Sequence, residues 1–319
     1  MVIGNLIFFI ISCIVLIYSG TWLVKSLVKV ASFLKMNEFI VSFIIMAFAT
    51  SLPELFVGIN SALTSASAIS LGNVLGSNIA NLSLVLGIAI VFSRGIKVGG
   101  AYIRKDSWLM FGIMFLPLIL MYLGRTLSRL DGIILLVVLG FYFWRVILRR
   151  KRYSKKFENN IRKSKAILYT AMFIFSLIVL FVSSNFVVKY ASLLSIDFAL
   201  PPILIGLFLV ALGTSLPELV FSVRSGMLGH QEFIMGNLIG SVIINATLVL
   251  GITALIMPIT ANLLLFLTST AFMIVIGFLF ITFTESSRKL DLKEGVSLIL
   301  VYILFIIVQF YIHNLGGVI

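Results

Sequence analysis

Charged residues are scarce in this chain of 319 residues, since Asp, Glu, Lys and Arg together make up 11% of it, whereas hydrophobic residues make up 61%. So little charge at a mean hydropathy of +1.20 excludes a soluble globular domain and predicts a protein whose solvent is the lipid bilayer. The chain has one cysteine, Cys13, which excludes an intramolecular disulfide and is expected to serve in packing.

Long apolar runs dominate the sequence. Runs of about twenty residues, enough for a helix to cross roughly 30 Å of hydrocarbon, recur along the chain and lack the alternation of membrane β-barrel strands. We therefore expect an all-α membrane protein with ten transmembrane helices, at about 3–24, 39–63, 70–93, 107–124, 131–148, 166–188, 200–223, 233–257, 261–283 and 296–314.

Basic residues outnumber acidic ones by 24 to 11, which gives a net charge of +13. Their placement indicates membrane topology rather than a nucleic-acid partner. If the N-terminus is outside, all but three of the 24 fall in inside loops, the exceptions being Arg125, Arg129 and Lys189. This bias predicts a multi-pass cell-membrane protein with both termini outside. The basic stretch at 149–165 is then a cytoplasmic linker, which sets topology or, alternatively, binds anionic lipid.

The sequence repeats itself with an offset of 164 residues. ATSLPEL at 49–55 matches GTSLPEL at 213–219, and GNVLGSNIANLSLVLG at 72–87 matches GNLIGSVIINATLVLG at 236–251 with ten of sixteen positions identical. Each half holds five expected spans, an odd number, so the second half enters the membrane from the opposite side. We therefore expect two inverted five-helix repeats, at 1–148 and 166–319, joined by the linker at 149–165.

Only two acidic residues, Glu54 and Glu218, are expected well inside the hydrocarbon, and they occupy matching positions of the repeat. A carboxylate inside a membrane persists if it is protonated, paired with a basic group or bound to a cation. No Lys or Arg is expected at that depth. A bound cation is therefore favoured over the two alternatives, a structural salt bridge and a permanently protonated glutamate.

Proline directly precedes each of these glutamates, at Pro53 and Pro217. In the middle of a helix, proline removes a backbone N–H and clashes with the preceding turn, so the helix is expected to break there. Carbonyl oxygens released near 47–50 and 211–214 can then line a cavity and become ion ligands. The alternative is a kink with no role in ion binding.

Polar side chains accompany both glutamates at helical spacings. In the first half, Thr50 and Ser51 lie one turn before Glu54, and Ser77 and Asn81 lie one turn apart; the second half repeats them as Thr214, Ser215, Ser241 and Asn245. Contacts between helices are the alternative role for such residues. Glycine pairs at 72 and 76 and at 236 and 240 are expected to let helices approach closely.

The resulting set of candidate ligands contains oxygen only. Hard cations such as Ca²⁺ and Na⁺ prefer such ligands, whereas Zn²⁺ or Cu would favour His and Cys. Competition of these ions for one pair of carboxylates would make exchange obligatory, because an empty site with two charges is costly to move through hydrocarbon. No catalytic set is found, so neither an enzyme nor a cofactor is expected.

At T-S-L-P-E and G-N-x-x-G-S-x-x-x-N, each present twice, the sequence resembles the calcium/cation antiporter superfamily and, within it, the prokaryotic sodium/calcium exchangers. The resemblance covers the chain end to end and implies exchange of Ca²⁺ for Na⁺ by alternating access. It implies that Glu54 and Glu218 are the central calcium ligands, with backbone carbonyls from Thr50 and Thr214.

The same resemblance implies two outer sodium positions. One would be framed by Ala47, Thr50 and Ser77, and the other by Ala211, Thr214 and Ser241. The remaining polar lining would come from Ser51, Asn81, Ser215 and Asn245.

One departure from the family pattern stands at Asn245, where several similar exchangers carry Asp. Asparagine here argues against potassium co-transport. Proton-coupled relatives usually read G-N-A-x-E in place of T-S-L-P-E, but a calcium/proton exchanger remains the alternative because the two glutamates could carry protons. A cation channel is a further alternative, although an internal inverted repeat is not typical of one. Membrane lipid is the expected surrounding, and no obligate protein partner is evident.

Overall fold

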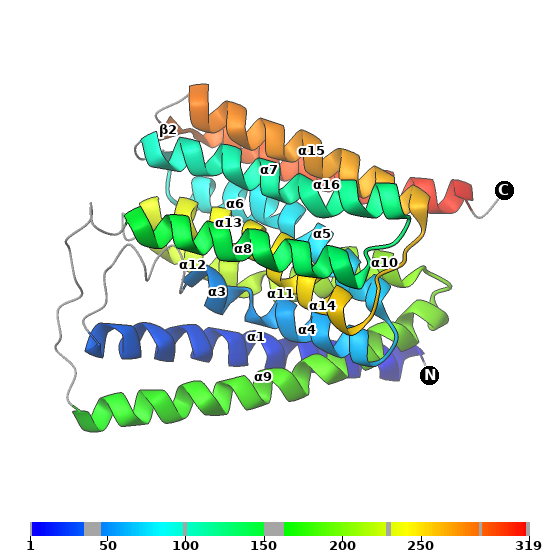
Figure 1. The fold of residues 1–319 in the computed structure, drawn as a ribbon, viewed down its shortest axis with the longest axis horizontal. Coiled ribbons are helices and arrows are strands. Elements are labelled where there is room, and N and C mark those ends of the chain that lie inside the picture. The colour runs from blue at the N-terminus through cyan, green and yellow to red at the C-terminus, as the bar shows by residue number, and fades with distance from the viewer. Residues whose placement is uncertain are drawn as a thin grey trace.

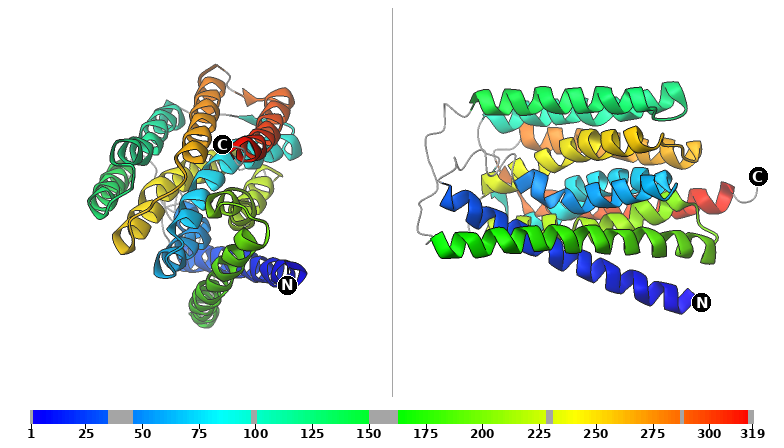
Figure 2. Two further views of the ribbon diagram at one scale, coloured as in Figure 1. Left: turned by 90° about the vertical axis from the view of Figure 1, so that its right-hand side faces the viewer. Right: turned by 60° about the horizontal axis from the view of Figure 1, so that its bottom comes forward.

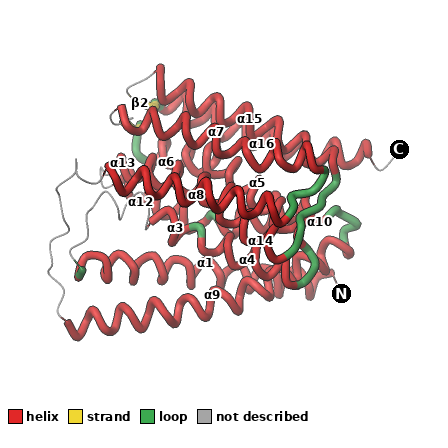
Figure 3. Tube along the Cα trace, viewed as in Figure 1, coloured by secondary structure: helices red, strands yellow, loops and turns green. Residues whose placement is uncertain are grey.

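The computed structural model describes residues 2–34, 46–97, 101–149, 163–227, 231–286 and 289–316. Nearly all of this part of the chain is helical, and most of the connecting loops lie at the ends of the bundle (Figure 3). The first half contains, in order, α1 (Val2–Phe33), α3 (Ala47–Thr50), α4 (Leu52–Leu63), α5 (Ser67–Ala80), the π-helix η2 (Asn81–Val85), α6 (Leu86–Phe92), β1 (Ile96–Lys97), α7 (Ala101–Gly124) and α8 (Arg129–Arg149).

The second half begins with the long helix α9 and then follows a closely similar order of elements. These are α9 (Lys163–Asp197), α10 (Pro202–Ile205), the π-helix η4 (Gly206–Val210), α11 (Ala211–Thr214), α12 (Leu216–Met227), α13 (Gln231–Ile244), the π-helix η5 (Asn245–Val249), α14 (Leu250–Ile256), α15 (Leu263–Ser286), β2 (Lys289–Leu290) and α16 (Leu292–Gly316).

Within the described residues, 9 helical segments are long and apolar enough to cross a membrane, and α4 is a shorter apolar helix. Together they correspond to the ten expected spans, except that residues 39–45 of the second expected span lie outside the described residues. The expected linker also lies mostly outside them, and α9 already begins at Lys163.

Two helices are longer than expected. α1 reaches Phe33 instead of ending near residue 24, and α9 runs for 35 residues, beyond both ends of the expected span at 166–188. The C-terminal extension of α9 packs against the start of α1, where Asn5 donates a hydrogen bond of 2.7 Å to Asp197 and Phe8 stacks on Tyr190.

The helices form an inner group and an outer group. The segments that carry the repeated motifs lie inside: 83% of the most apolar window of Ser67–Phe92 and 78% of that of Phe233–Ile256 is buried. For the windows in α1 and α9 the value is 22%. α1 and α9 lie at one side of the bundle, and α7, α15 and α16 lie at the other, with the inner group between them (Figures 1 and 2). The outer helices therefore present most of the lipid-facing apolar surface.

Short backbone contacts join the two halves at opposite ends of the bundle. β1 pairs with β2 in antiparallel register, with Ile96 opposite Leu290. Leu127 and Ile259 exchange two backbone hydrogen bonds of 3.0 Å. β2 lies at the left of Figure 1, where α15 ends, whereas the second contact joins the loops after α7 and α14 at the right. All four side chains are fully buried, so each contact closes one end of the inner group.

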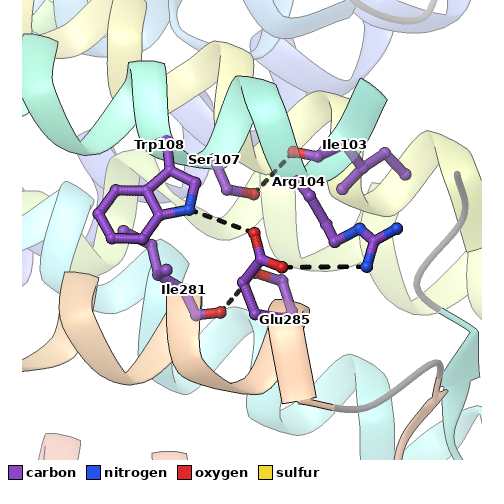
Figure 4. A network of polar contacts seen from close by, with 7 residues as sticks. Ile103, Arg104, Ser107, Trp108, Ile281 and Glu285 are labelled. Atoms are coloured by element: carbon purple, nitrogen blue, oxygen red, sulfur yellow. Dashed lines mark hydrogen bonds and ion pairs between the residues drawn. The ribbon is translucent and has the colours of Figure 1, made fainter. Parts of the chain in front are cut away.

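An exposed polar network joins α7 to α15 at the end of the bundle where β2 lies (Figure 4). Glu285 accepts a hydrogen bond from the indole Nε1 of Trp108 at 3.2 Å and lies 3.9 Å from a guanidinium nitrogen of Arg104. Because the charged side chains are 47% and 43% exposed, solvent screens this ion pair and it contributes little to stability. Glu285 thus lies at a helix end, as expected from the sequence.

Candidate ion-binding site

Each repeated glutamate lies in the first turn of a helix that starts inside the bundle. The chain leaves α3 at Ser51, where φ is −84° and ψ is 2°, and α4 begins at Leu52 with Pro53 in its first turn. Proline is tolerated there because the first N–H groups of a helix have no intrahelical partner. Glu54 follows, near the positive end of the α4 dipole, which favours a negative charge.

The second half repeats this break. α11 ends at Ser215, where φ is −84° and ψ is 0°, and Glu218 lies in the first turn of α12. The structure therefore confirms the helix breaks that Pro53 and Pro217 predict. Because Pro53 has no N–H to donate, the carbonyl of Ala49 loses its usual helical partner and accepts another backbone N–H at the end of α3. The carbonyl of Gly213 loses its usual partner before Pro217 for the same reason.

Both carboxylates are completely buried. The two carboxylates lie near enough to each other for their charges to interact. Among the described residues, neither forms an ion pair with Lys, Arg or His, and three of their four oxygens, Oε2 of Glu54 and both of Glu218, accept no hydrogen bond. Two buried charges in this state are strongly unfavourable unless another charge or a proton compensates them.

Hydroxyl groups pair across the two halves beside these carboxylates. Thr50 Oγ1 lies 3.2 Å from Ser241 Oγ, and Thr214 Oγ1 lies 3.3 Å from Ser77 Oγ. Ser77 also reaches Glu54 Oε1 at 3.4 Å. Each pair thus combines a threonine before a helix break with a serine from the other half.

These hydroxyl pairs differ from the groups expected for the sodium positions, which placed Thr50 with Ser77 and Thr214 with Ser241. The reason is the docking of the halves, because α3 packs against α13 while α11 packs against α5. A backbone carbonyl of the same half completes each group: the Thr50 hydroxyl lies 3.4 Å from Ala47 O and the Thr214 hydroxyl lies 3.3 Å from Ala211 O.

All twelve expected site residues are buried, with none more than 3% exposed. The polar side-chain atoms of four of them have no hydrogen-bond partner among the described residues, namely those of Ser51, Ser215, Asn81 and Asn245. Asn81 and Asn245 are the first residues of η2 and η5. These π-helical turns were not expected from the sequence, and such turns are frequent at functional sites.

Glycine brings the two halves into backbone contact at the site. A Cβ atom on Gly72 would overlap the carbonyl oxygen of Ile203, and one on Gly76 would overlap that of Leu207. The close approach expected at these two glycines is therefore confirmed. It holds Ser77 in α5 against Thr214 in α11.

Two asparagines that belong to the site were missed in the sequence. Asn73 and Asn237 are fully buried, and each accepts a hydrogen bond from a threonine of the site. Asn73, Ser77 and Asn81 are spaced by four residues and so share one helix face, which is the signal that could have revealed them.

The site therefore offers two carboxylates, paired hydroxyls and carbonyl oxygens in a buried, oxygen-lined centre. Such a set suits Ca²⁺, which takes six to eight oxygen ligands, and Na⁺, whose single charge one carboxylate can balance. It can hold one divalent cation, or several monovalent ones, between two charges that otherwise repel each other.

Comparison with known proteins gives a consistent result. A family model described as sodium/calcium exchanger protein matches residues 4–148 and again residues 168–311. The chain is 29% identical to the sodium/calcium exchanger MaX1 of Methanosarcina acetivorans, over 98% of this chain and 100% of that protein. It is 30% identical to the putative antiporter CaxA of Alkalimonas amylolytica, over 79% of this chain and 81% of that protein.

Solved structures resemble the fold over nearly its whole length. Structures of the sodium-calcium exchanger NCX_Mj, soaked with 2.5 mM Na⁺ and 0.1 mM Ca²⁺ in one case, align with a TM-score of 0.68 at 26% identity. The alignment covers 95% of this chain and 98% of that one. The arrangement of helices is therefore shared with these structures.

Proposed function

The chain belongs to the sodium/calcium exchanger family, and from this we infer that it is a secondary active antiporter that exchanges Ca²⁺ for Na⁺ across the membrane. The observation that carries this proposal is the pair of fully buried carboxylates, Glu54 and Glu218, which have no basic partner among the described residues. Their charge needs a mobile compensating cation, and the oxygen atoms around them suit hard cations.

In the proposed binding mode, Glu54 and Glu218 hold Ca²⁺ together, with carbonyl oxygens at Thr50 and Thr214. Na⁺ ions bind in the two cross-half groups. One group is Thr50, Ser241 and the Ala47 carbonyl, and the other is Thr214, Ser77 and the Ala211 carbonyl. Ser51, Ser215, Asn81 and Asn245 supply further oxygens. Because Na⁺ and Ca²⁺ use the same carboxylates, they exclude each other.

Obligatory exchange follows from the free-energy cost of changing conformation while the site is empty. Moving two uncompensated carboxylates past the hydrocarbon is strongly unfavourable, so the loaded protein changes conformation far more readily than the empty one. Ca²⁺ crosses in one direction and Na⁺ in the other.

Two inverted repeats would supply the two conformations. This arrangement is supported by the recurrence of the broken helix, the buried helix and the π-helix at the same offset in both halves. The family model also matches each half separately. In Figure 1, α1 runs from right to left whereas α9 runs from left to right, and the two backbone contacts between the halves lie at opposite ends. If the two halves exchanged their conformations, the site would open to the opposite side of the membrane.

The orientation proposed for the chain places α8 and α9 with their adjoining ends in the cytoplasm. In Figure 1 these ends lie at the left, whereas α1 begins and α16 ends at the right. The basic residues around 149–165 favour the cytoplasm for the left end, so both termini would lie outside.

The deciding experiment uses purified protein in proteoliposomes loaded with Na⁺. Dilution into Na⁺-free buffer containing ⁴⁵Ca²⁺ is expected to drive Ca²⁺ uptake, and an equal K⁺ gradient at the same pH is expected not to. Uptake that follows a pH gradient and ignores Na⁺ would identify a calcium/proton exchanger instead, and unitary currents in planar bilayers would identify a channel.

A further inference from the structure

Asn73 and Asn237 occupy matching positions one turn before Ser77 and Ser241, and each contacts the threonine of the opposite half. Thr214 donates its hydroxyl hydrogen to Asn73 Oδ1 at 3.0 Å, and Thr50 donates to Asn237 Oδ1 at 3.3 Å. Every atom in these contacts is buried. The asparagines therefore belong to the cross-half groups.

Besides the asparagine and the paired serine hydroxyl, each threonine hydroxyl has a backbone acceptor within reach. For Thr214 this is Ala211 O at 3.3 Å, and for Thr50 it is Ala47 O at 3.4 Å. A hydroxyl carries one hydrogen, so it serves one acceptor at a time. The choice of acceptor decides which oxygen lone pairs remain free.

The alanine carbonyls already accept one backbone hydrogen bond each. Ser215 N donates to Ala211 O at 3.0 Å, and Ser51 N donates to Ala47 O at 3.1 Å. A carbonyl oxygen has two lone pairs, so one remains for a cation. If the threonine hydrogen turned to that carbonyl, it would take the second lone pair and place its own positive charge near the ion.

We propose that Asn73 and Asn237 are positioning residues that hold the hydroxyl hydrogens of Thr214 and Thr50 away from the bound cation, so that each threonine oxygen and the neighbouring alanine carbonyl both face it. This inference rests on the proposed function of the site. It applies most to Na⁺, because neutral oxygens make up most of the cross-half groups, whereas Ca²⁺ depends first on the two carboxylates.

A packing role alone does not account for these asparagines. The amide nitrogen Nδ2 of each is buried and has no acceptor among the described residues. A buried donor without a partner is destabilising, so an apolar side chain of similar size would serve packing better. Replacement by leucine should therefore leave the fold intact and remove only the acceptor.

The crossed partners supply an internal control. Asn73 contacts Thr214 and not Thr50, so its effect should disappear when Thr214 has no hydroxyl and persist when Thr50 has none. Asn78 supplies a second control, because it is a fully buried asparagine of the same helix with no hydrogen-bond partner among the described residues.

The test measures Na⁺-dependent ⁴⁵Ca²⁺ uptake in proteoliposomes as a function of the concentration of Na⁺ and, separately, of Ca²⁺. For Asn73→Leu we expect the half-saturating Na⁺ concentration to rise about five-fold, the effect of one lost hydrogen bond, while the half-saturating Ca²⁺ concentration and the maximal rate change less than about two-fold. Asn78→Leu should leave all three values near those of the wild type.

Double variants then test the route of the effect. Asn73→Leu added to Thr214→Val should change nothing further, whereas Asn73→Leu and Thr50→Val should multiply their effects. An unchanged Na⁺ dependence in Asn73→Leu, or equal coupling to both threonines, would overturn the proposal.

Failure of the proposed function gives a different result. If wild-type protein shows no Na⁺-dependent uptake, that function is wrong, and the same variants are compared by calorimetric titration of the purified protein with NaCl or CaCl₂. An unchanged dissociation constant for both cations in Asn73→Leu then rules out a positioning role, whereas a weaker one that depends on Thr214 supports it.

Discussion

Gly76 in α5 touches the backbone of Leu207 in η4 so closely that a Cβ atom on the glycine would overlap the carbonyl oxygen of Leu207. The same Cβ would lie 2.7 Å from the Cβ of Ala211. Two elements from different halves of the chain thus meet without a side chain between them. The spacing of the ion-site oxygens from the two halves depends on this contact.

Gly76→Ala is therefore expected to separate the halves and weaken both folding and transport. Overpacking of a tight core typically costs about 1–3 kcal/mol, and here the obstructing atom belongs to the backbone and cannot rotate away. Thermal unfolding in detergent and Ca²⁺ uptake in proteoliposomes measure the two effects.

Gly140→Ala provides the matched control for Gly76→Ala. Gly140 lies in α8, and a Cβ there would meet no atom within 4 Å. Because alanine is the better helix former, this variant should unfold at the same temperature as the wild type or slightly above it. Equal behaviour of the two variants would show that the contact at Gly76 does not matter.

Replacing either buried carboxylate by its amide removes the charge that the cation compensates. We expect Glu54→Gln and Glu218→Gln to insert and fold but to lose Na⁺-dependent Ca²⁺ uptake, because one remaining carboxylate cannot balance Ca²⁺. Radiotracer flux and size-exclusion profiles provide the two readouts.

Glu285→Gln is the control for these two amides. Its carboxylate is exposed and contacts Arg104 and Trp108 from the last turn of α15 (Figure 4). Loss of the ion pair with Arg104 should change Na⁺-dependent Ca²⁺ uptake by less than about two-fold. Wild-type flux in Glu54→Gln or Glu218→Gln would remove these residues from the ligand set.

The candidate site residues and the helix breaks within each half could be predicted from the sequence. The way in which the two halves dock could not. The two glutamates, the helix breaks at the prolines and the close approach at Gly76 each follow from local rules for residues in a membrane helix. The partner of Thr50 does not, because Ser241 reaches it only through packing between segments 191 residues apart. The π-turn at Asn81 likewise has no marker in local sequence preference.

Asn245 offers a way to change proton sensitivity by one charge. Its amide is fully buried and has no hydrogen-bond partner among the described residues. In Asn245→Asp a third carboxylate would join Glu54 and Glu218, and three like charges around one site favour binding of a proton. We expect Ca²⁺ uptake by this variant to fall more steeply than that of the wild type as the pH is lowered.

The measurement for Asn245→Asp is Na⁺-dependent flux between pH 6 and 8 in wild type and variant, with internal and external pH kept equal. The control variant is Asn245→Gln, which keeps the amide and adds no charge. Parallel pH profiles for all three proteins would show that residue 245 lies outside the electrostatic reach of the site.

The proposed orientation can be tested with single cysteines, since the native chain has only Cys13 and this residue is buried. In a Cys13→Ala background, Arg125→Cys tests the connection between α7 and α8, and Lys165→Cys tests the start of α9. Both positions are exposed and lie at opposite ends of the bundle. If the basic end faces the cytoplasm, an impermeant maleimide should label only the first in intact cells, and both after the membrane is permeabilised. Labelling of Lys165→Cys alone in intact cells would invert the orientation, and would mean that the basic residues of this chain do not set its topology.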